Sequence, residues 1–424
     1  MELKTDGGKE VEDLVEKICT KMFFSDFTVR SPKFKKENLQ EKEAADILIP
    51  FDNELIAFQV KTKTELKSAS EKNDIDFKRI NKIIEKAVDQ LKTIKRALAK
   101  NRITDLKTAK GYTVPFTCDS VRKVIGVIII DLLGEEKFPE SDRTFIMNGF
   151  VVRNDIPTHI FKREEFEAIS SELDTLPDFL EYLSIRELLF SNNLFLLPPL
   201  ELDLLAFYKV DPDKVIGAIK RQINLIIEEG SWEHYQTQYA DDIRKRNRLN
   251  EPSYLIDMII EWLHSSVGFD LNTEVIQRVS RKQQGTIEGY LAIAVELAKI
   301  SRIQRRLIGE RLFKCLIQAD NIGHGHSLII DTNAKRGILV VCSSGTREQR
   351  GKELYNLSAM AYCANDLNKL IGIATEPLSV HLRSYDVFML NGESFENHEE
   401  LRELAKKVFG SRHEADFSEY QETK

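Results

Sequence analysis

The most regular hydrophobic pattern of the chain occupies residues 44–63, AADILIPFDNELIAFQVKTK. Two almost wholly apolar runs flank Asp52-Asn53, which predicts a β-hairpin closed by a two-residue turn. Apolar residues on both faces indicate a central pair of strands that is covered on both sides. The turn is expected to place Asp46 opposite Gln59, with their Cβ atoms roughly 5 Å apart, and alternation along the strand brings Lys61 to the same face.

Helical periodicity is found on both sides of this hairpin. Residues 7–18 open a helix whose apolar side continues to Met22, and residues 76–98 have the apolar spacing of a long amphipathic helix. The β-branched run VIGVIIID at residues 124–131 predicts a buried strand, and residues 27–30 predict a short one. The expected order is therefore helix, strand, hairpin, helix, strand.

The composition changes after residue 131. Residues 132–148 are polar and rich in turn formers, and residues 151–158 indicate a linker or a short extended piece. From residue 163 to about residue 308, apolar spacing of three and four predicts an almost wholly helical segment. The helices expected there span residues 163–173, 176–189, 212–229, 232–246, 253–265, 273–281 and 287–300.

The last part of the chain repeats the pattern of the first. A helix at residues 308–316, strands at 327–330 and 337–342, a helix at 346–364 and a strand at 369–374 follow in the same order. The polar positions do not repeat: Val341 or Cys342 and Ser343 or Ser344 stand where the first copy has Gln59 and Lys61. We interpret this region as a degenerate copy of the first fold, without its lysine.

The polar residues of the first hairpin indicate metal chemistry. The Asp46 carboxylate, the Gln59 amide oxygen and the backbone carbonyl of Val60 form a hard oxygen set that suits Mg²⁺ or Mn²⁺. The ammonium of Lys61 can orient or deprotonate a water and stabilise a phosphoryl transition state. The alternative interpretation is structural, with Asp46 at the entry of one strand and Lys61 and Lys63 ending the next in solvent.

With Asp on one strand and Gln-x-Lys on the next, the hairpin resembles the PD-(D/E)XK nuclease superfamily in its Mrr-like form. The resemblance covers residues 1–135 and implies a restriction-endonuclease-like αβββαβ core. It also implies a glutamate of the first helix at the metal, with Glu12 at the matching spacing and Glu10 as the second choice. Several families of the superfamily place a glutamine on the helix after the hairpin. The candidate here is Gln90, and the alternative interpretation is a solvated residue at the flank of the apolar stripe. One departure is that Gln59 stands where the name-giving second acid would be.

Charge and composition add to this interpretation. The chain has a formal net charge of −7, yet residues 78–110 contain eleven Lys and Arg against three acids, as a phosphate-backbone contact or a merely solvated helix face would. Five scattered cysteines suggest neither disulfides nor a zinc ribbon. No signal peptide and no apolar segment of roughly 20 residues is found, so we expect a cytoplasmic protein without a membrane partner.

The sequence thus predicts a multi-domain α/β protein with a nuclease domain at residues 1–155, a helical connector at 156–305 and a C-terminal α/β domain at 306–424. The expected activity is metal-dependent hydrolysis of DNA, with RNA as the other substrate considered, in a prokaryotic restriction or anti-phage defence effector. The expected partners are DNA and either a second copy or a partner subunit. The alternative is a non-catalytic nucleic-acid-binding or assembly subunit on a nuclease-like scaffold.

Overall fold

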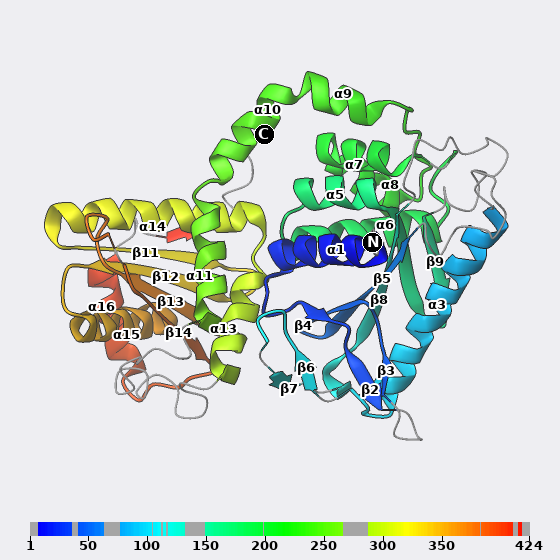
Figure 1. Ribbon diagram of the computed structural model, residues 1–424. Helices are drawn as coiled ribbons and strands as arrows, with labels where there is room; N and C mark the ends of the chain where they lie inside the picture. Colours follow the sequence, from blue (N-terminus) through cyan, green and yellow to red (C-terminus); the bar gives the residue numbers. More distant parts are fainter. Residues whose placement is uncertain are drawn as a thin grey trace, which may run out of the picture. The chain divides into compact units, whose positions relative to one another are not determined.

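The chain forms two compact units, residues 1–243 and 244–424 (Figure 1). The computed structural model describes residues 7–35, 41–62, 77–103, 105–111, 113–115, 118–131, 149–197, 199–265, 287–381, 383–409 and 414–417. These two units differ from the three segments expected from the sequence, because helices of the expected connector are shared between them. Both units are mixed α/β, which confirms the coarse fold class.

The first unit is built on a six-stranded mixed sheet with the order β1-β4-β5-β8-β10-β9. Strand β4 is antiparallel to β5, β5 is parallel to β8, β8 is parallel to β10, and β10 is antiparallel to β9. The strands are β1 (Val29–Arg30), β4 (Ile47–Phe51), β5 (Glu54–Thr62), β8 (Lys123–Asp131), β9 (Phe150–Arg153) and β10 (Ile156–Lys162). Residues 151–158, expected as a linker or a short extended piece, are therefore extended and belong to a hairpin that widens this sheet.

The central hairpin has the turn and the register that the sequence predicts. Strand β4 pairs with β5 from Phe51 opposite Glu54 to Ile47 opposite Phe58. The turn is Asp52-Asn53, and Asp52 adopts the left-handed φ of 53° that such tight turns require of at least one residue. Side chains on both faces of the pair are almost completely buried, as expected for central strands.

Helices cover both faces of this sheet. On one face, Leu48, Ala57 and Ile130 are buried against α3 (Phe77–Ala99). On the other face, Phe58 packs against Phe23 and Phe166, with ring centroids 6.1 and 5.7 Å apart. These two rings belong to α1 (Gly7–Phe23) and α5 (Arg163–Glu172), and α6 (Leu176–Ser191) packs beside them through Phe179.

Shorter elements complete the first unit. The sequence did not predict α7. The helix expected at residues 212–229 ends at Arg221, where Gln222 takes a left-handed φ of 54°. The helix expected at residues 232–246 is divided at Tyr239 into two helices, α9 and α10. These elements are β2 (Lys33–Lys35), β3 (Glu41–Glu43), β6 (Asp105–Lys107), β7 (Thr113–Pro115), η1 (Cys118–Ser120), α7 (Glu201–Val210), α8 (Pro212–Arg221), α9 (Ser231–Gln238) and α10 (Ala240–Asn250), the last of which continues into the second unit.

The second unit has a five-stranded mixed sheet with the order β14-β13-β12-β11-β15. Strand β11 is antiparallel to β12 and parallel to β15, while β13 is parallel to β12 and antiparallel to β14. The strands are β11 (His324–Asp331), β12 (Arg336–Ser343), β13 (Lys369–Thr375), β14 (Tyr385–Asn391) and β15 (Glu414–Asp416). The core positions Ile329, Ile338 and Val340 are fully buried.

Helices also cover both faces of the second sheet (Figure 1). The helix before the hairpin, α14 (Arg302–Ile322), lies on one face, and Leu339 and Val341 on the opposite face are buried with Leu354 and Leu357 of α15 (Arg347–Ala364). The other helices are α11 (Ser253–Ser265), α13 (Ile287–Ala298) and α16 (His398–Phe409). The helix expected at residues 273–281 lies outside the described residues.

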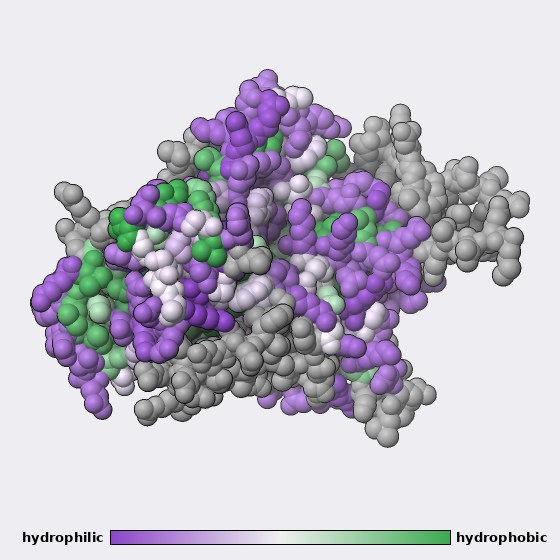
Figure 2. Space-filling view, turned by 60° about the vertical axis from the view of Figure 1, so that its left-hand side comes forward, coloured by the Kyte–Doolittle hydropathy of each residue, from purple (hydrophilic) through white to green (hydrophobic). Residues whose placement is uncertain are grey.

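The coloured part of the surface in Figure 2 is mostly hydrophilic, with hydrophobic residues gathered in a few patches. On α14, Phe313 and Ile317 lie one turn apart and are 48% and 42% exposed. Within the described part of the chain, no helix combines the length and the hydropathy needed to cross a bilayer.

The two units share one arrangement of elements. In each, a helix precedes an antiparallel hairpin, a second helix covers the sheet, and the next strand lies parallel to the second strand of the hairpin. The strands β4-β5-β8 thus correspond to β11-β12-β13 in order and direction, as the repeat in the sequence predicts. The next neighbour differs, because β8 is followed by the parallel strand β10 and β13 by the antiparallel strand β14.

Candidate active site

Asp46 lies at the point where the antiparallel pairing of the hairpin stops. Strand β4 begins at Ile47, whose partner residue on β5 is Phe58. The N–H of Asp46 donates to the carbonyl of Phe58 at 3.1 Å. The Asp46 carboxylate turns toward β5 and accepts the N–H of Val60 at 2.5 Å. It therefore satisfies a backbone donor that the ladder leaves without a strand partner.

The backbone of Val60 faces the same place. In an extended strand the N–H and C=O of one residue point to the same edge, and the N–H of Val60 points to Asp46. Its carbonyl oxygen is thus directed at the open end of β4, next to the carboxylate. A backbone carbonyl in such a place is the kind of oxygen that hard divalent cations take as a ligand.

Lys61 extends toward the Asp46 carboxylate. Its Nζ lies 3.9 Å from Oδ2, and the two side chains are only 12% and 17% exposed. This burial does not fit the structural alternative, in which Lys61 ends the strand in solvent. An ammonium in this position costs desolvation free energy, which the neighbouring carboxylate offsets.

Gln59 is even more enclosed, with 3% of its surface exposed. It lies two residues after Ala57, whose side chain is buried against α3, so alternation places Gln59 and Lys61 on that face of the sheet. A buried amide offers a neutral oxygen, which adds no negative charge to the site. The site therefore depends on Asp46 and one further acid for its negative charge.

Glu12 on α1 is close enough to Asp46 to sense its charge. Burial first, and then the charges of Asp46 and Glu43, raise the pKa of the Glu12 carboxyl, although Arg30 acts in the opposite direction. Two carboxylates that oppose each other's ionisation form a place where a cation is favoured. Glu10, the second choice from the sequence, is exposed.

Arg30 is a residue of this site that the sequence did not indicate. Its guanidinium lies 3.6 Å from Glu12, 2.7 Å from Glu16, and pairs with Asp13 as well. Arg30 ends β1, next to the start of β4, and so joins α1 to the strand that leads to Asp46. The only signal in the sequence is the group of acids on α1, which has no obvious partner there.

Gln90 lies on the flank of α3 that is turned toward β5. Lys95 on the opposite flank donates to the Asn154 carbonyl at 2.9 Å, in the turn between β9 and β10, and the two residues are about 140° apart around the helix. The Oε1 atom of Gln90 is buried and accepts no hydrogen bond within the described part of the chain. This orphaned acceptor distinguishes Gln90 from an ordinary solvated flank residue.

The donor set fits a hard divalent cation. It consists of the carboxylates of Asp46 and Glu12, the carbonyl of Val60 and the amide of Gln59, all of which are oxygen donors. Among the described residues, no three His, Cys, Asp or Glu side chains gather as a metal site. A cation here would therefore need the amide and the backbone carbonyl to complete its ligands.

The corresponding edge of the second unit has different residues. When positions are counted from the first residue of the second strand of each hairpin, Val341 takes the place of Gln59 and Ser343 takes that of Lys61. The Ser343 hydroxyl accepts the N–H of Gly345 at 3.4 Å. Neither an acid pair nor a lysine is present at these positions.

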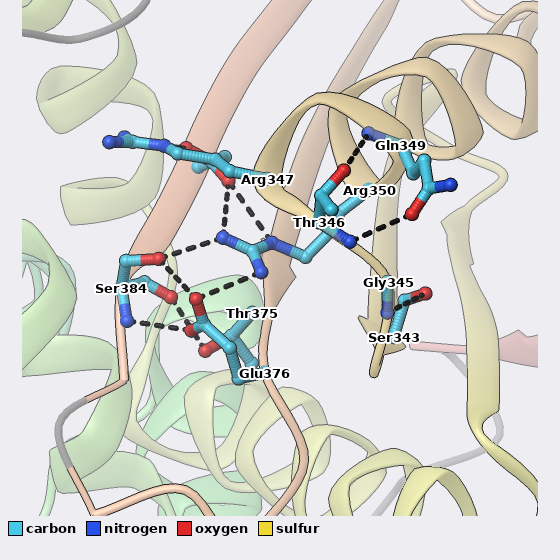
Figure 3. Close-up of polar contacts among 10 residues, drawn as sticks. Ser343, Gly345, Thr346, Arg347, Gln349, Arg350, Thr375, Glu376 and Ser384 are labelled. Carbon is cyan, nitrogen blue, oxygen red and sulfur yellow. Dashed lines mark hydrogen bonds and ion pairs between the residues drawn. The ribbon is translucent and has the colours of Figure 1, made fainter.

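A closed ionic network lies beside this edge (Figure 3). Arg350 is 1% exposed, and its guanidinium contacts Glu376 and Asp386, both at 2.9 Å, and donates to the Ser384 hydroxyl at 2.7 Å. Ser384 in turn donates its hydroxyl to Glu376 at 2.6 Å, and Arg347 pairs with Asp386. These groups bind one another, so the network is suited to holding β13, β14 and α15 together.

Comparisons of the chain with protein-family models, with curated proteins and with solved structures each gave no match.

Proposed function

We propose that the protein is a metal-dependent endonuclease that hydrolyses phosphodiester bonds of DNA, with a PD-(D/E)XK-like catalytic unit of the Mrr-like form. The observation that carries this proposal is the position of Asp46, whose carboxylate contacts both the Val60 backbone and, at 3.9 Å, the Lys61 ammonium. An acid, a carbonyl and a half-buried lysine at the open end of a strand pair are the parts that such hydrolysis needs.

The oxygen donors come from the β4–β5 hairpin and from α1. Asp46, Gln59 and the carbonyl of Val60 would hold Mg²⁺ or Mn²⁺, with Glu12 approaching from α1. A bound divalent ion supplies Lewis acidity toward a phosphoryl oxygen and lowers the pKa of a coordinated water. Gln59 contributes no charge, so the carboxylates of Asp46 and Glu12 must balance the cation.

Lys61 has the role of a charged donor beside the reacting phosphate. Its ammonium can hydrogen-bond a phosphoryl oxygen, where negative charge grows in the transition state, and can orient the attacking water. The enclosing side chains reduce competing solvent, which strengthens this interaction. Arg30 keeps Glu12 near Asp46 and is a positioning residue.

The test is cleavage of supercoiled plasmid DNA by the purified full chain. We expect nicking in Mg²⁺ or Mn²⁺ and none after addition of EDTA, with a Lys61→Ala preparation as the control for contaminating nuclease. The same assay on RNA decides between the two substrates. No metal-dependent cleavage of either nucleic acid would contradict the proposal.

The second candidate function is a non-catalytic nucleic-acid-binding or assembly subunit. It is favoured by the neutral amide of Gln59 in an acid position and by the absence of an acid pair and lysine at Val341 and Ser343 in the second unit. Binding of DNA without cleavage under every metal condition would support it. In the leading proposal, the biological setting is cytoplasmic defence against foreign DNA, in a homo-oligomer or with a partner subunit.

A further inference from the structure

The exposed face of α3 carries four cations. Lys82, Lys86 and Arg96 are exposed, and Lys92 is half-buried. None of the four forms an ion pair within the part of the chain that the structure describes. Lys95, by contrast, lies on the flank toward β9 and pairs with Asp155 at 3.3 Å.

The acids of this face do not neutralise these cations. Glu85 and Asp89 lie on it, and Asp89 contacts Arg153 of β9 at 3.4 Å. Arg153 is 46% exposed and adds a further positive charge beside the helix. The result is a basic surface on a chain whose formal net charge is −7. Because the chain as a whole is acidic, this local basic surface does not follow from its overall composition and indicates a binding surface for an anion.

The basic face begins close to the candidate active site. The first turns of α3 pack through Ile84 and Val88 onto Ile128 and Ile130 of β8. Ile130 is the partner of Lys61 in the parallel pairing of β8 with β5. The helix therefore runs from the catalytic end of the strands across the same face of the sheet that bears Gln59 and Lys61.

We infer that the exposed face of α3 binds the phosphate backbone of the DNA duplex that the first unit cleaves. Residues 82–96 span about 21 Å of helix, the rise of roughly six base pairs. Because these cations form no ion pair with any residue that the structure describes, they can release counterions from DNA without breaking one of those pairs. The inference rests on the proposed function for its substrate, and it assigns that substrate to a specific surface.

The experiment measures binding of the full chain to a 25-base-pair duplex in EDTA, so that no cleavage occurs, at several salt concentrations. Two double variants, K82Q/K86Q and K92Q/R96Q, each remove two of the cations. We expect each to weaken binding at least about fivefold and to lower the slope of log Kd against log salt by about one to two. The matched control is K17Q/K21Q on α1, which removes two exposed lysines on the opposite side of the sheet and should leave the slope unchanged.

Two results separate this inference from the proposed function. If the native chain cleaves plasmid while both double variants bind and cleave as it does, the surface assignment is overturned and the nuclease proposal stands. If the double variants lose binding but no metal supports cleavage, the surface assignment stands and the nuclease proposal fails. An equal loss in the α1 control would also overturn the assignment, because it would show an effect of net charge alone. Thermal unfolding of all variants should match the native chain, since the altered side chains lie at the surface.

Discussion

The two units carry different chemical groups at corresponding edges of their sheets, beside β4-β5-β8 in the first and β11-β12-β13 in the second. In the first, Asp46 and Lys61 lie 3.9 Å apart with their side chains 17% and 12% exposed, and Gln90 of α3 has a buried acceptor without a partner among the described residues. In the second, Arg350 is surrounded by acids and a hydroxyl that satisfy one another. The difference teaches that the strand arrangement supplies only a position. Whether that position stabilises the protein or can bind a ligand depends on how completely its polar groups are paired.

The largest effect is expected from removal of Arg350. Arg350→Met leaves Glu376 and Asp386 without their buried partner, and we expect a loss of about 3–5 kcal/mol in the free energy of unfolding of the second unit. Denaturant unfolding measures it. Lys352→Ala on the same helix is the control, because its pair with Glu348 is exposed and should contribute less than about 0.5 kcal/mol. A small effect of Arg350→Met would mean that the second edge is not a structural network.

The first edge should respond in activity. Lys61→Ala and Asp46→Asn are each expected to reduce metal-dependent cleavage by on the order of 10²–10³, the usual effect of removing one charge-stabilising group. Asp46→Asn keeps an acceptor for the Val60 N–H, so its fold should persist. Initial rates on plasmid, together with circular dichroism of each variant, measure the effect. Full activity of a folded Lys61→Ala protein would refute the site.

Gln59 tests which oxygen atoms bind the cation. We expect Gln59→Glu to bind Mn²⁺ at least as tightly as the native chain, because it adds a carboxylate to a hard oxygen set. Gln59→Leu should weaken binding by about 10- to 100-fold, since it removes the amide oxygen. Calorimetric titration compares the three proteins. Identical metal affinities would show that Gln59 packs in the core without coordinating.

The smallest effect concerns pH. Burial raises the pKa of the Glu376 carboxyl. The hydrogen bond from the Ser384 hydroxyl and the charge of Arg350 lower the same pKa by more, so that it lies below its usual value. Its stability contribution is thus present above the usual value of 4.5 and is lost as pH falls through the depressed pKa. The raised pKa of Glu12 acts with the opposite sign, favouring the folded state below 4.5 and losing that contribution as pH rises.

Melting temperatures between pH 3 and 7 measure this contrast. Glu376→Gln should flatten the acid limb of the native curve, and Glu12→Gln should gain stability relative to the native chain as pH rises. Parallel curves for all three proteins would contradict the opposite signs.

The elements that the sequence predicts best are those whose pattern is local. The β4–β5 hairpin, its turn at Asp52-Asn53 and the second hairpin follow from alternation and turn chemistry, which act over a few residues. The helix break at Gln222 was not predicted, because apolar spacing continues through a left-handed residue. Residues 151–158 were expected as a linker or a short extended piece, because four residues with weak alternation become strand β9 only through their pairing with β10.

The sequence predicts which residues belong to the candidate site, but not the contacts that these residues make. The sequence indicated Asp46, Gln59, Lys61 and Glu12, while the bond from the Val60 N–H to Asp46 depends on where β4 begins. Arg30 and the network around Arg350 join positions far apart in the sequence. No periodicity encodes such pairs, since their partners are chosen by tertiary packing.

The parallel pairing of β5 with β8 has a consequence for the order of folding. The β4–β5 hairpin joins neighbouring residues and can form within roughly 1–10 μs. Lys61, however, meets its strand partner Ile130 only after a long crossover that includes α3 has closed. We expect the contact between Asp46 and Val60 to form early in folding. Gln90 and the basic face of α3 should reach their native positions only in the slower phase in which β8 pairs with β5. A ribosome-bound chain would then hold its hairpin in register well before it could enclose Lys61.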